Sequence, residues 1–170
     1  MNTNCDQARH APLSSHRVLL VFSLALVGFV LLFRAHFVLC LAKGESMLPG
    51  LRSGDLLLVD KLAYETKDPM RGDVVVARER HELIVKRVVG LPGEEIEVRQ
   101  GRLIVNQRPF AETHAVEPGW LSLRKGRLLE NKYALLGDNR SVSGSVSVHA
   151  VVAKDQILGK VIRSVRLWPG

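Results

Sequence analysis

Aromatic residues and cysteines are scarce in this chain of 170 residues. Phe, Trp and Tyr make up 5% of the sequence, and the two cysteines are Cys5 and Cys40. They flank a long apolar run, so they cannot pair within one chain if that run spans a bilayer. Neither a disulfide framework nor a metal-ligand spacing is present, and the six histidines show no paired arrangement. We therefore expect no metal and no other cofactor.

Acidic residues are fewer than basic ones, with 17 Asp and Glu against 24 Lys and Arg. The formal net charge is therefore +7 and the pI is near 9.8. This balance suits either nucleic acid or an anionic membrane surface. The basic residues are scattered through strand-like segments and are not interleaved with aromatic residues, so we expect no nucleic-acid partner. The 14 glycines and the many Val, Leu and Ile residues favour strands and turns over a helical bundle.

One run is long enough to approach the thickness of a membrane. Residues 18–33 carry no charge, and only Ser23 and Gly28 are not apolar. As a helix they would cover roughly 24 Å of a hydrocarbon core that is about 30 Å thick. Arg17 and Arg34 bracket the run and can extend toward the head groups, which lengthens the usable span. We predict a transmembrane anchor over residues 17–34.

The charges around this run indicate an orientation. Basic residues precede it over positions 9–17, which favours a cytoplasmic N-terminus. A cleaved signal peptide is the alternative, because residues 40–42 (Cys-Leu-Ala) offer small side chains before a cleavage site. Arg34 and His36 interrupt the stretch before that site and favour retention. We thus expect a short cytoplasmic tail over 1–16 and an extracytoplasmic domain over 35–170.

The remainder of the chain is typical of a mainly β domain. Short apolar runs separated by Gly, Pro and Asp turns predict a mostly antiparallel sheet or partial barrel hung from one helix. Residues 108–131 contain Pro109, Pro118 and Gly119 and show no clear element. The predicted strands cover residues 35–42, 56–60, 74–77, 83–89, 96–99, 103–106, 133–136 and 156–165, with a charged turn over 78–82.

Two residues in this β region suggest a chemistry. Ser46 lies in a turn between Gly44 and Gly50, and a serine hydroxyl needs a base to act as a nucleophile at neutral pH. Lys86 lies in a strand-like run, where alternation places it on one face with Ile84 and Val88. Removal from water favours the neutral amine, so we expect a lowered pKa for Lys86. Each residue alone also has an ordinary structural explanation. Ser46 would be a turn serine that bonds its own backbone, and Lys86 would extend its amine to water at a strand edge.

The order of several segments resembles the type I signal peptidase family over nearly the whole chain from Arg34 to Pro169. Residues 44–49 (Gly-Glu-Ser-Met-Leu-Pro) resemble its nucleophile motif, and residues 54–59 its second motif. Residues 71–76 followed by 84–94 resemble the segment that carries its lysine. Residues 136–140 (Leu-Gly-Asp-Asn-Arg) with Ser143 resemble the last motif, and residues 105–109 a recurrent hairpin.

The resemblance implies a membrane-anchored serine endopeptidase that removes signal peptides from exported preproteins, cutting after a small residue. It implies that Ser46 is the nucleophile, that Lys86 is the general base and that Ser143 orients Lys86. The backbone N–H of Ser46 would help to bind the oxyanion, and Met47 would line the substrate side. The expected partners are signal peptides and the lipid bilayer. The expected form is a monomer in the bacterial inner membrane, with the catalytic domain outside the cytoplasm.

The last motif departs from the family pattern. Ser145 stands where the family has Asp, and Ser147 where it has Arg. Arg87, beside the expected base, would then need another carboxylate, and Asp138 is the candidate. Gly44 replaces the serine that some members use as a second oxyanion donor.

Three alternatives to a general signal peptidase are open at this stage. The short chain and the altered last motif suit a specialised peptidase, such as the pilin-maturing enzyme of a conjugation system. A self-cleaving repressor would use a similar Ser/Lys domain, but its DNA-binding head is replaced here by an apolar run. A catalytically impaired relative would act only as a binding module.

Overall fold

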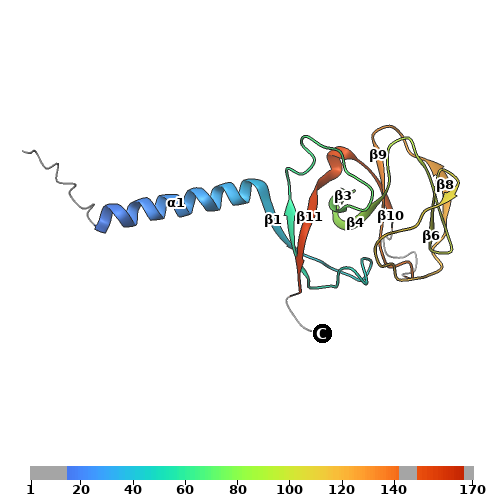
Figure 1. Ribbon diagram of the computed structural model, residues 1–170, viewed down its shortest axis with the longest axis horizontal. Coiled ribbons are helices and arrows are strands. Elements are labelled where there is room, and N and C mark those ends of the chain that lie inside the picture. Colours follow the sequence, from blue (N-terminus) through green and yellow to red (C-terminus); the bar gives the residue numbers. More distant parts are fainter. Residues whose placement is uncertain (1–14, 142–148, 167–170) are drawn as a thin grey trace, which may run out of the picture. The chain divides into compact units, whose positions relative to one another are not determined.

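The computed structural model describes residues 15–141 and 149–166, and the chain divides after Ala35 into two compact units (Figure 1). The first unit contributes the helix α1, which covers Ser15–His36. It begins two residues before the predicted span of 17–34 and ends two residues after it. Proline is absent from these 22 residues, so no backbone donor is lost and the helix continues unbroken.

The helix α1 has the length and composition of a membrane-crossing segment. Its mean hydropathy reaches 2.5 over an 18-residue window, and its length is about 33 Å at 1.5 Å per residue. Its large apolar side chains are exposed, for example Phe22 at 70% and Leu31 at 63%. Such a surface is costly in water, so α1 is a candidate for burial in lipid.

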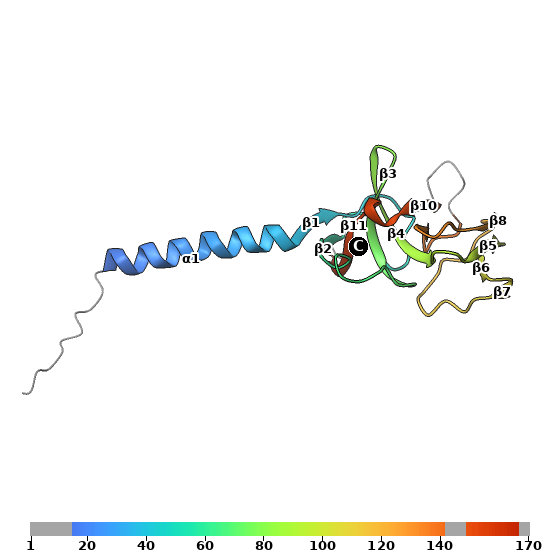
Figure 2. The same cartoon turned by 90° about the horizontal axis from the view of Figure 1, so that it is seen from above.

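The second unit is built on a seven-stranded sheet in which neighbouring strands run antiparallel. The strand order is β1-β2-β11-β3-β4-β9-β10. Figure 2 shows the strands of this unit from above. The strands are β1 (Phe37–Leu41), β2 (Leu56–Asp60), β3 (Val74–Glu79), β4 (Glu82–Gly90), β9 (Lys132–Leu136), β10 (His149–Ala153) and β11 (Ile157–Val165).

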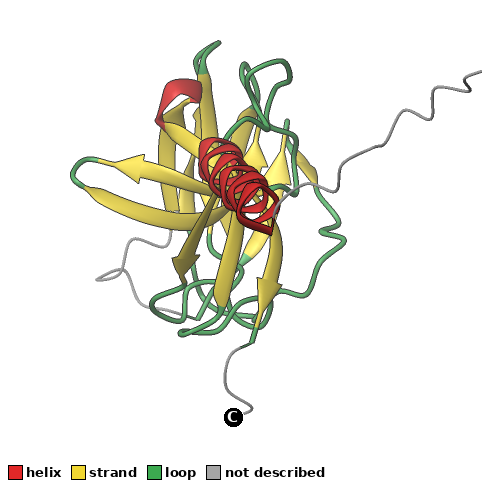
Figure 3. Ribbon diagram, turned by 90° about the vertical axis from the view of Figure 1, so that its left-hand side faces the viewer, coloured by secondary structure: helices red, strands yellow, loops and turns green. Residues whose placement is uncertain are grey.

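The residues between β4 and β9 form a second sheet, which is antiparallel and four-stranded. Its order is β7-β6-β5-β8, and a short 3-10 helix, η1 (Lys154–Gln156), precedes β11. Figure 3 shows how strands and loops make up this second unit. The strands are β5 (Glu95–Arg99), β6 (Arg102–Val105), β7 (Arg108–Pro109) and β8 (Leu123–Arg127).

The predicted mainly β, antiparallel fold with one N-terminal helix is confirmed, with shifts at several boundaries. The predicted turn over 78–82 is too long, because β3 continues to Glu79 and β4 starts at Glu82. A positive φ of 52° at Arg80 lets the chain reverse within two residues. The sequence pattern did not indicate β8 or β10. Strand β8 (Leu-Arg-Lys-Gly-Arg) is too charged to show apolar alternation.

Apolar burial fixes the strands that carry the site. One buried cluster combines residues from β3, β4, β9, β10 and β11, among them Val75, Ile84 and Val88. Another lies against the turn that holds Ser46 and includes Met47, with Leu57 and Val59 from β2. Leu57, Val75 and Val88 are all fully enclosed at 0% exposure. Because side chains on a strand alternate between faces, this packing also sets the register of β4.

Candidate functional site

Ser46 lies in the turn that follows β1, and the segment after β9 holds it in place. The backbone N–H of Asn139 donates to the Ser46 carbonyl oxygen at 3.0 Å, and the Asn139 side-chain amide donates to the Glu45 carbonyl at 3.1 Å. Gly137 makes the closest approach, since a Cβ built there would lie 2.4 Å from the Ser46 carbonyl oxygen. Only glycine allows these two backbones to approach so closely.

Lys86 reaches this turn from the middle of β4. Its neighbours on the same face, Ile84 and Val88, are buried, as the alternation predicted. The Lys86 side chain is itself buried, with the residue 4% exposed, and Ser46 is 7% exposed. The Lys86 Nζ lies 2.6 Å from the Ser46 Oγ, which is hydrogen-bond distance, although 40 positions separate the two residues.

The electrostatics of this pair favour a neutral amine. Burial lowers the pKa of Lys86 below its ordinary value of 10.5, and the carboxylates of Glu79 and Asp138 oppose that shift without reversing it. A neutral amine has a lone pair that can accept the Ser46 hydroxyl proton. The arrangement is therefore chemically able to activate a serine nucleophile.

Arg87, the residue after Lys86, pairs with Asp138. The guanidinium donates to both carboxylate oxygens, at 2.9 Å from Nε and 2.6 Å from Nη2, and its Nη1 donates to the Gly72 carbonyl at 2.8 Å. Asp138 is fully buried, so this two-point contact compensates a charge that would otherwise be costly. Asp138 thus occupies the place proposed for it as the carboxylate partner of Arg87.

Of the remaining predicted site residues, Met47 is found beside the pair and Ser143 is not described. Met47 is 4% exposed and lines the same groove as Ser46 and Lys86. Ser143 lies outside the described residues, so its orienting role stays a prediction. Within residues 15–141 and 149–166, no three His, Cys, Asp or Glu side chains cluster as metal ligands.

A groove of about 500 Å³ opens onto Ser46 and Lys86. One wall comes from residues 40–47, at the end of β1 and in the turn, and the other from residues 82–86 of β4. Strand β4 pairs with β3 from Glu82 to Arg87 but with β9 only from Arg87 to Gly90. Within the described chain, the first half of β4 therefore has no strand on one side, and it lines this groove.

Sequence reasoning missed the contribution of Glu112 and His114. Both lie in the segment 108–131, for which the sequence pattern predicts no element. Glu112 pairs with the buried Arg140 at 2.6 Å, and His114 Nε2 lies 3.4 Å from Asp138 Oδ1. No motif or spacing indicates these contacts, because the two segments meet only through the tertiary fold.

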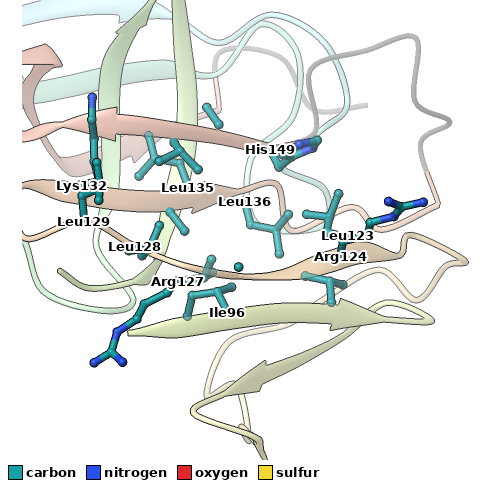
Figure 4. A pocket seen from close by; sticks show the side chains of 16 residues that line it. Ile96, Leu123, Arg124, Arg127, Leu128, Leu129, Lys132, Leu135, Leu136 and His149 are labelled. Carbon is teal, nitrogen blue, oxygen red and sulfur yellow. The ribbon is translucent and has the colours of Figure 1, made fainter. Parts of the chain in front are cut away.

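A separate cavity of about 420 Å³ lies between the two sheets and away from this pair (Figure 4). Its aliphatic lining comes from both sheets, for example Ile96 of β5 and Leu136 of β9. Neither Ser46 nor Lys86 lines it. His149 and Lys132 do, but its lining residues include no serine, threonine or cysteine that could act as a nucleophile. The groove at Ser46 is thus the candidate active site.

Comparison with known proteins finds a family match over most of the chain. Residues 15–168 match the model of the family described as signal peptidase, peptidase S26. The chain belongs to this signal peptidase family. The match takes in α1 and both residues of the Ser46–Lys86 pair.

Similar proteins carry the same family name. The chain is 33% identical over 133 residues to a "Probable signal peptidase I-2" of Synechocystis sp., and 33% identical over 135 residues to a signal peptidase I of Leptolyngbya laminosa. Each alignment covers 74% of this chain but only 60% and 66% of those two relatives. A signal peptidase IB of Staphylococcus aureus is 31% identical over 170 residues, with 88% of each chain covered.

A solved structure is also similar. A crystal structure of a signal peptidase I from Enterococcus faecalis is 25% identical, with a TM-score of 0.46. The similarity covers 56% of this chain and 97% of that one.

Proposed function

We propose that this chain is a membrane-bound serine endopeptidase that removes N-terminal signal peptides from exported preproteins. Ser46 is the nucleophile and Lys86 the general base in this proposal. The observation that supports it most directly is the 2.6 Å contact between the buried Lys86 Nζ and the Ser46 Oγ. A surface lysine would be charged and could not accept a proton, so the burial matters as much as the distance.

The reaction proceeds in two halves through an acyl-enzyme. The neutral Lys86 amine takes the Ser46 hydroxyl proton while Oγ bonds to the scissile carbonyl carbon. The resulting ammonium then gives that proton to the leaving amine of the mature protein as the peptide bond breaks. In the second half, Lys86 takes a proton from water, the hydroxide attacks the ester, and the proton returns to Ser46 Oγ.

The Ser46 backbone N–H is the proposed oxyanion donor. Among the described residues it donates no hydrogen bond within the protein, so it remains available to a substrate oxygen. Turn 44–48 fixes its direction, because the Leu48 N–H donates to the Glu45 carbonyl at 3.1 Å. A fixed donor aimed at developing negative charge lowers the barrier without reorganisation during the reaction.

The groove suits an extended peptide that ends in a small side chain. The unpaired edge of β4 from Glu82 to Lys86 can form backbone hydrogen bonds with an added strand. Close to the catalytic pair, the lining includes the buried residues Ala42, Met47 and Ile84, which leave little room for a bulky side chain. We therefore expect cleavage after a small residue.

We assign α1 as a single membrane anchor and place the β domain outside the cytoplasm. The helix is long and apolar enough to cross a bilayer, and basic residues precede it. This orientation puts the β domain on the side where exported preproteins emerge. The proposed location is the bacterial inner membrane, with a monomer as the working unit.

Processing of a preprotein by the full chain in lipid vesicles tests this function. Wild type is expected to release the mature protein, whereas Ser46→Ala and Lys86→Ala are expected to leave the precursor intact. The exposed turn variant His81→Ala serves as the matched control and should process normally. Unchanged processing by both site variants would overturn the proposal. Cleavage of one pilin-type precursor, with other secreted precursors left intact, would favour the specialised peptidase that the altered last motif suggests.

A further inference from the structure

The segment 112–119 packs directly against residues 138–140, which in turn hydrogen-bond the turn that holds Ser46. The Glu117 N–H donates to the Asp138 carbonyl at 3.0 Å, and the Arg140 N–H donates to the Glu117 carbonyl at 2.9 Å. Further along, a Cβ at Gly119 would lie 2.0 Å from the Arg140 carbonyl oxygen, so only glycine fits there. These contacts fix the side chains of the segment close to Asp138.

Five side chains then form a chain of contacts that ends beside Lys86. Arg140 binds Glu112 at 2.6 Å, and Arg87 binds Asp138 through both carboxylate oxygens. His114 lies between the two pairs, with its Nε2 at 3.4 Å from Glu112 Oε1 and at 3.4 Å from Asp138 Oδ1. Asp138 and Glu112 side chains are only 1% and 10% exposed, so solvent does little to screen these charges.

The charged side chains around His114 sum to zero when its imidazole is neutral. Two guanidinium groups, on Arg87 and Arg140, face two carboxylates, on Asp138 and Glu112, so a proton added to the imidazole would leave a net positive charge. Burial and the Arg87 charge lower the pKa of His114, against the opposing pull of the two carboxylates. The ring is therefore neutral near pH 7.

A neutral imidazole has one N–H group, and its position matters here. The Nε2 atom is buried and makes no hydrogen bond of normal geometry within the described residues. A lone pair facing two carboxylate oxygens would be repelled, whereas an N–H in the same place is attracted to both. Buried polar atoms without a full partner are rare and call for an explanation.

We propose that His114 is a positioning residue for the catalytic pair, and that its neutral Nε2–H group holds the Asp138 carboxylate against Arg87. This inference rests on the proposed function. Asp138 and its neighbour Asn139 touch both halves of the site. The Asp138 side chain binds the residue after Lys86, and the Asn139 backbone binds the Ser46 carbonyl. A displaced Asp138 would therefore disturb the distance between Ser46 and Lys86.

The sequence gives a reason why Asp138 needs this additional contact from His114 in this chain. Ser145 and Ser147 stand where the family pattern has an Asp and an Arg. Glu112 and His114 bring a carboxylate and an imidazole to Arg140 and Asp138 from another segment. These contacts arise in the segment 108–131, which has no element of regular structure between Pro109 and Leu123.

Two His114 variants separate positioning from packing. His114→Phe keeps a ring of similar size and removes the donor, whereas His114→Gln keeps an N–H donor. We expect His114→Phe to lower kcat about tenfold with little change in KM, because the reacting atoms lose alignment. The acid limb of the kcat/KM profile should move to higher pH, since an Asp138 carboxylate that has lost the His114 donor favours the Lys86 ammonium more strongly. His114→Gln should restore both properties, and His81→Ala should match wild type.

The same experiments give results that would overturn the inference. Wild-type kcat and an unmoved acid limb in His114→Phe would do so, even with reduced thermal stability, as would equal losses in the Phe and Gln variants. If His114→Phe does not fold, nitrogen NMR of wild type decides, because the inference requires a neutral ring protonated at Nε2 near pH 7. An imidazolium or an Nδ1–H ring contradicts it. Ser46→Ala separates failure of this inference from failure of the proposed function, since an active Ser46→Ala enzyme overturns the proposed function itself.

Discussion

Ser46 and Asn139 are joined backbone to backbone, with the Asn139 N–H donating to the Ser46 carbonyl at 3.0 Å. This bond ties the Ser46 turn to the end of β9, while β9 also pairs with the second half of β4. The strand that carries Lys86 and the turn that carries Ser46 therefore share one support. The 2.6 Å distance within the pair follows from that shared support and from apolar packing around β4.

The close approach of Gly137 to Ser46 predicts a sharp effect of one methyl group. In Gly137→Ala the new Cβ would lie 2.4 Å from the Ser46 carbonyl oxygen, so the turn must move. A shift of about 1 Å at a reacting atom can cost roughly 100-fold in rate, and we expect a loss of that size in kcat. Gly126→Ala is the control, because nothing lies within 4 Å of its Cβ. Equal peptidase activity in the two variants would contradict this role for Gly137.

The buried Arg87–Asp138 pair predicts a large loss of stability when one partner is removed. Asp138→Ala leaves the Arg87 guanidinium without its carboxylate, and we expect about 3–5 kcal/mol less free energy of unfolding. The exposed pair Lys154–Asp68, at 41% and 76% side-chain exposure, provides the comparison. Asp68→Ala should cost no more than about 1 kcal/mol. Denaturant unfolding of the two variants measures both values, and similar losses would argue against a special role for the buried pair.

The lowered pKa of Lys86 predicts a pH-dependent stability. Between the folded-state pKa and the ordinary value of 10.5, the unfolded chain binds a proton at Lys86 that the folded chain does not. The free energy of unfolding contributed by this group therefore falls as pH decreases through that window and rises toward pH 10.5. Lys86→Met has no such group, so it should be more stable than wild type at neutral pH. The difference should narrow as pH rises, and a pH-independent difference would show that the amine is not neutral when folded.

Much of the site could be predicted because its signals are local. Alternation along residues 83–89 placed Lys86 on a buried face, and the ordered motifs linked it to Ser46. Asp138 could be suggested as the partner of Arg87 only from a departure in the last motif. The exact length of the turn at Arg80 could not be read from the sequence, since a positive φ at a non-glycine residue has no reliable signal.

The unpredicted features share a different origin. Glu112 and His114 reach Asp138 because backbone hydrogen bonds join residues 117 and 138–140, and such long-range contacts leave no periodic pattern. Strand β8 is held by pairing with β5, and its charged sequence resembles a loop. The role of Ser143 stays a prediction from resemblance alone.

The rate of Ser46 acylation as a function of pH tests the central claim most directly. The purified full chain is incubated with an acyl-transferring inhibitor of the β-lactam type, and modification of Ser46 is followed by mass spectrometry. If a neutral Lys86 activates Ser46, the rate should rise with an apparent pKa well below 10.5, and Lys86→Met should react far more slowly. An apparent pKa near 10.5 for the acylation rate would contradict the account, as would equal acylation rates for Lys86→Met and wild type.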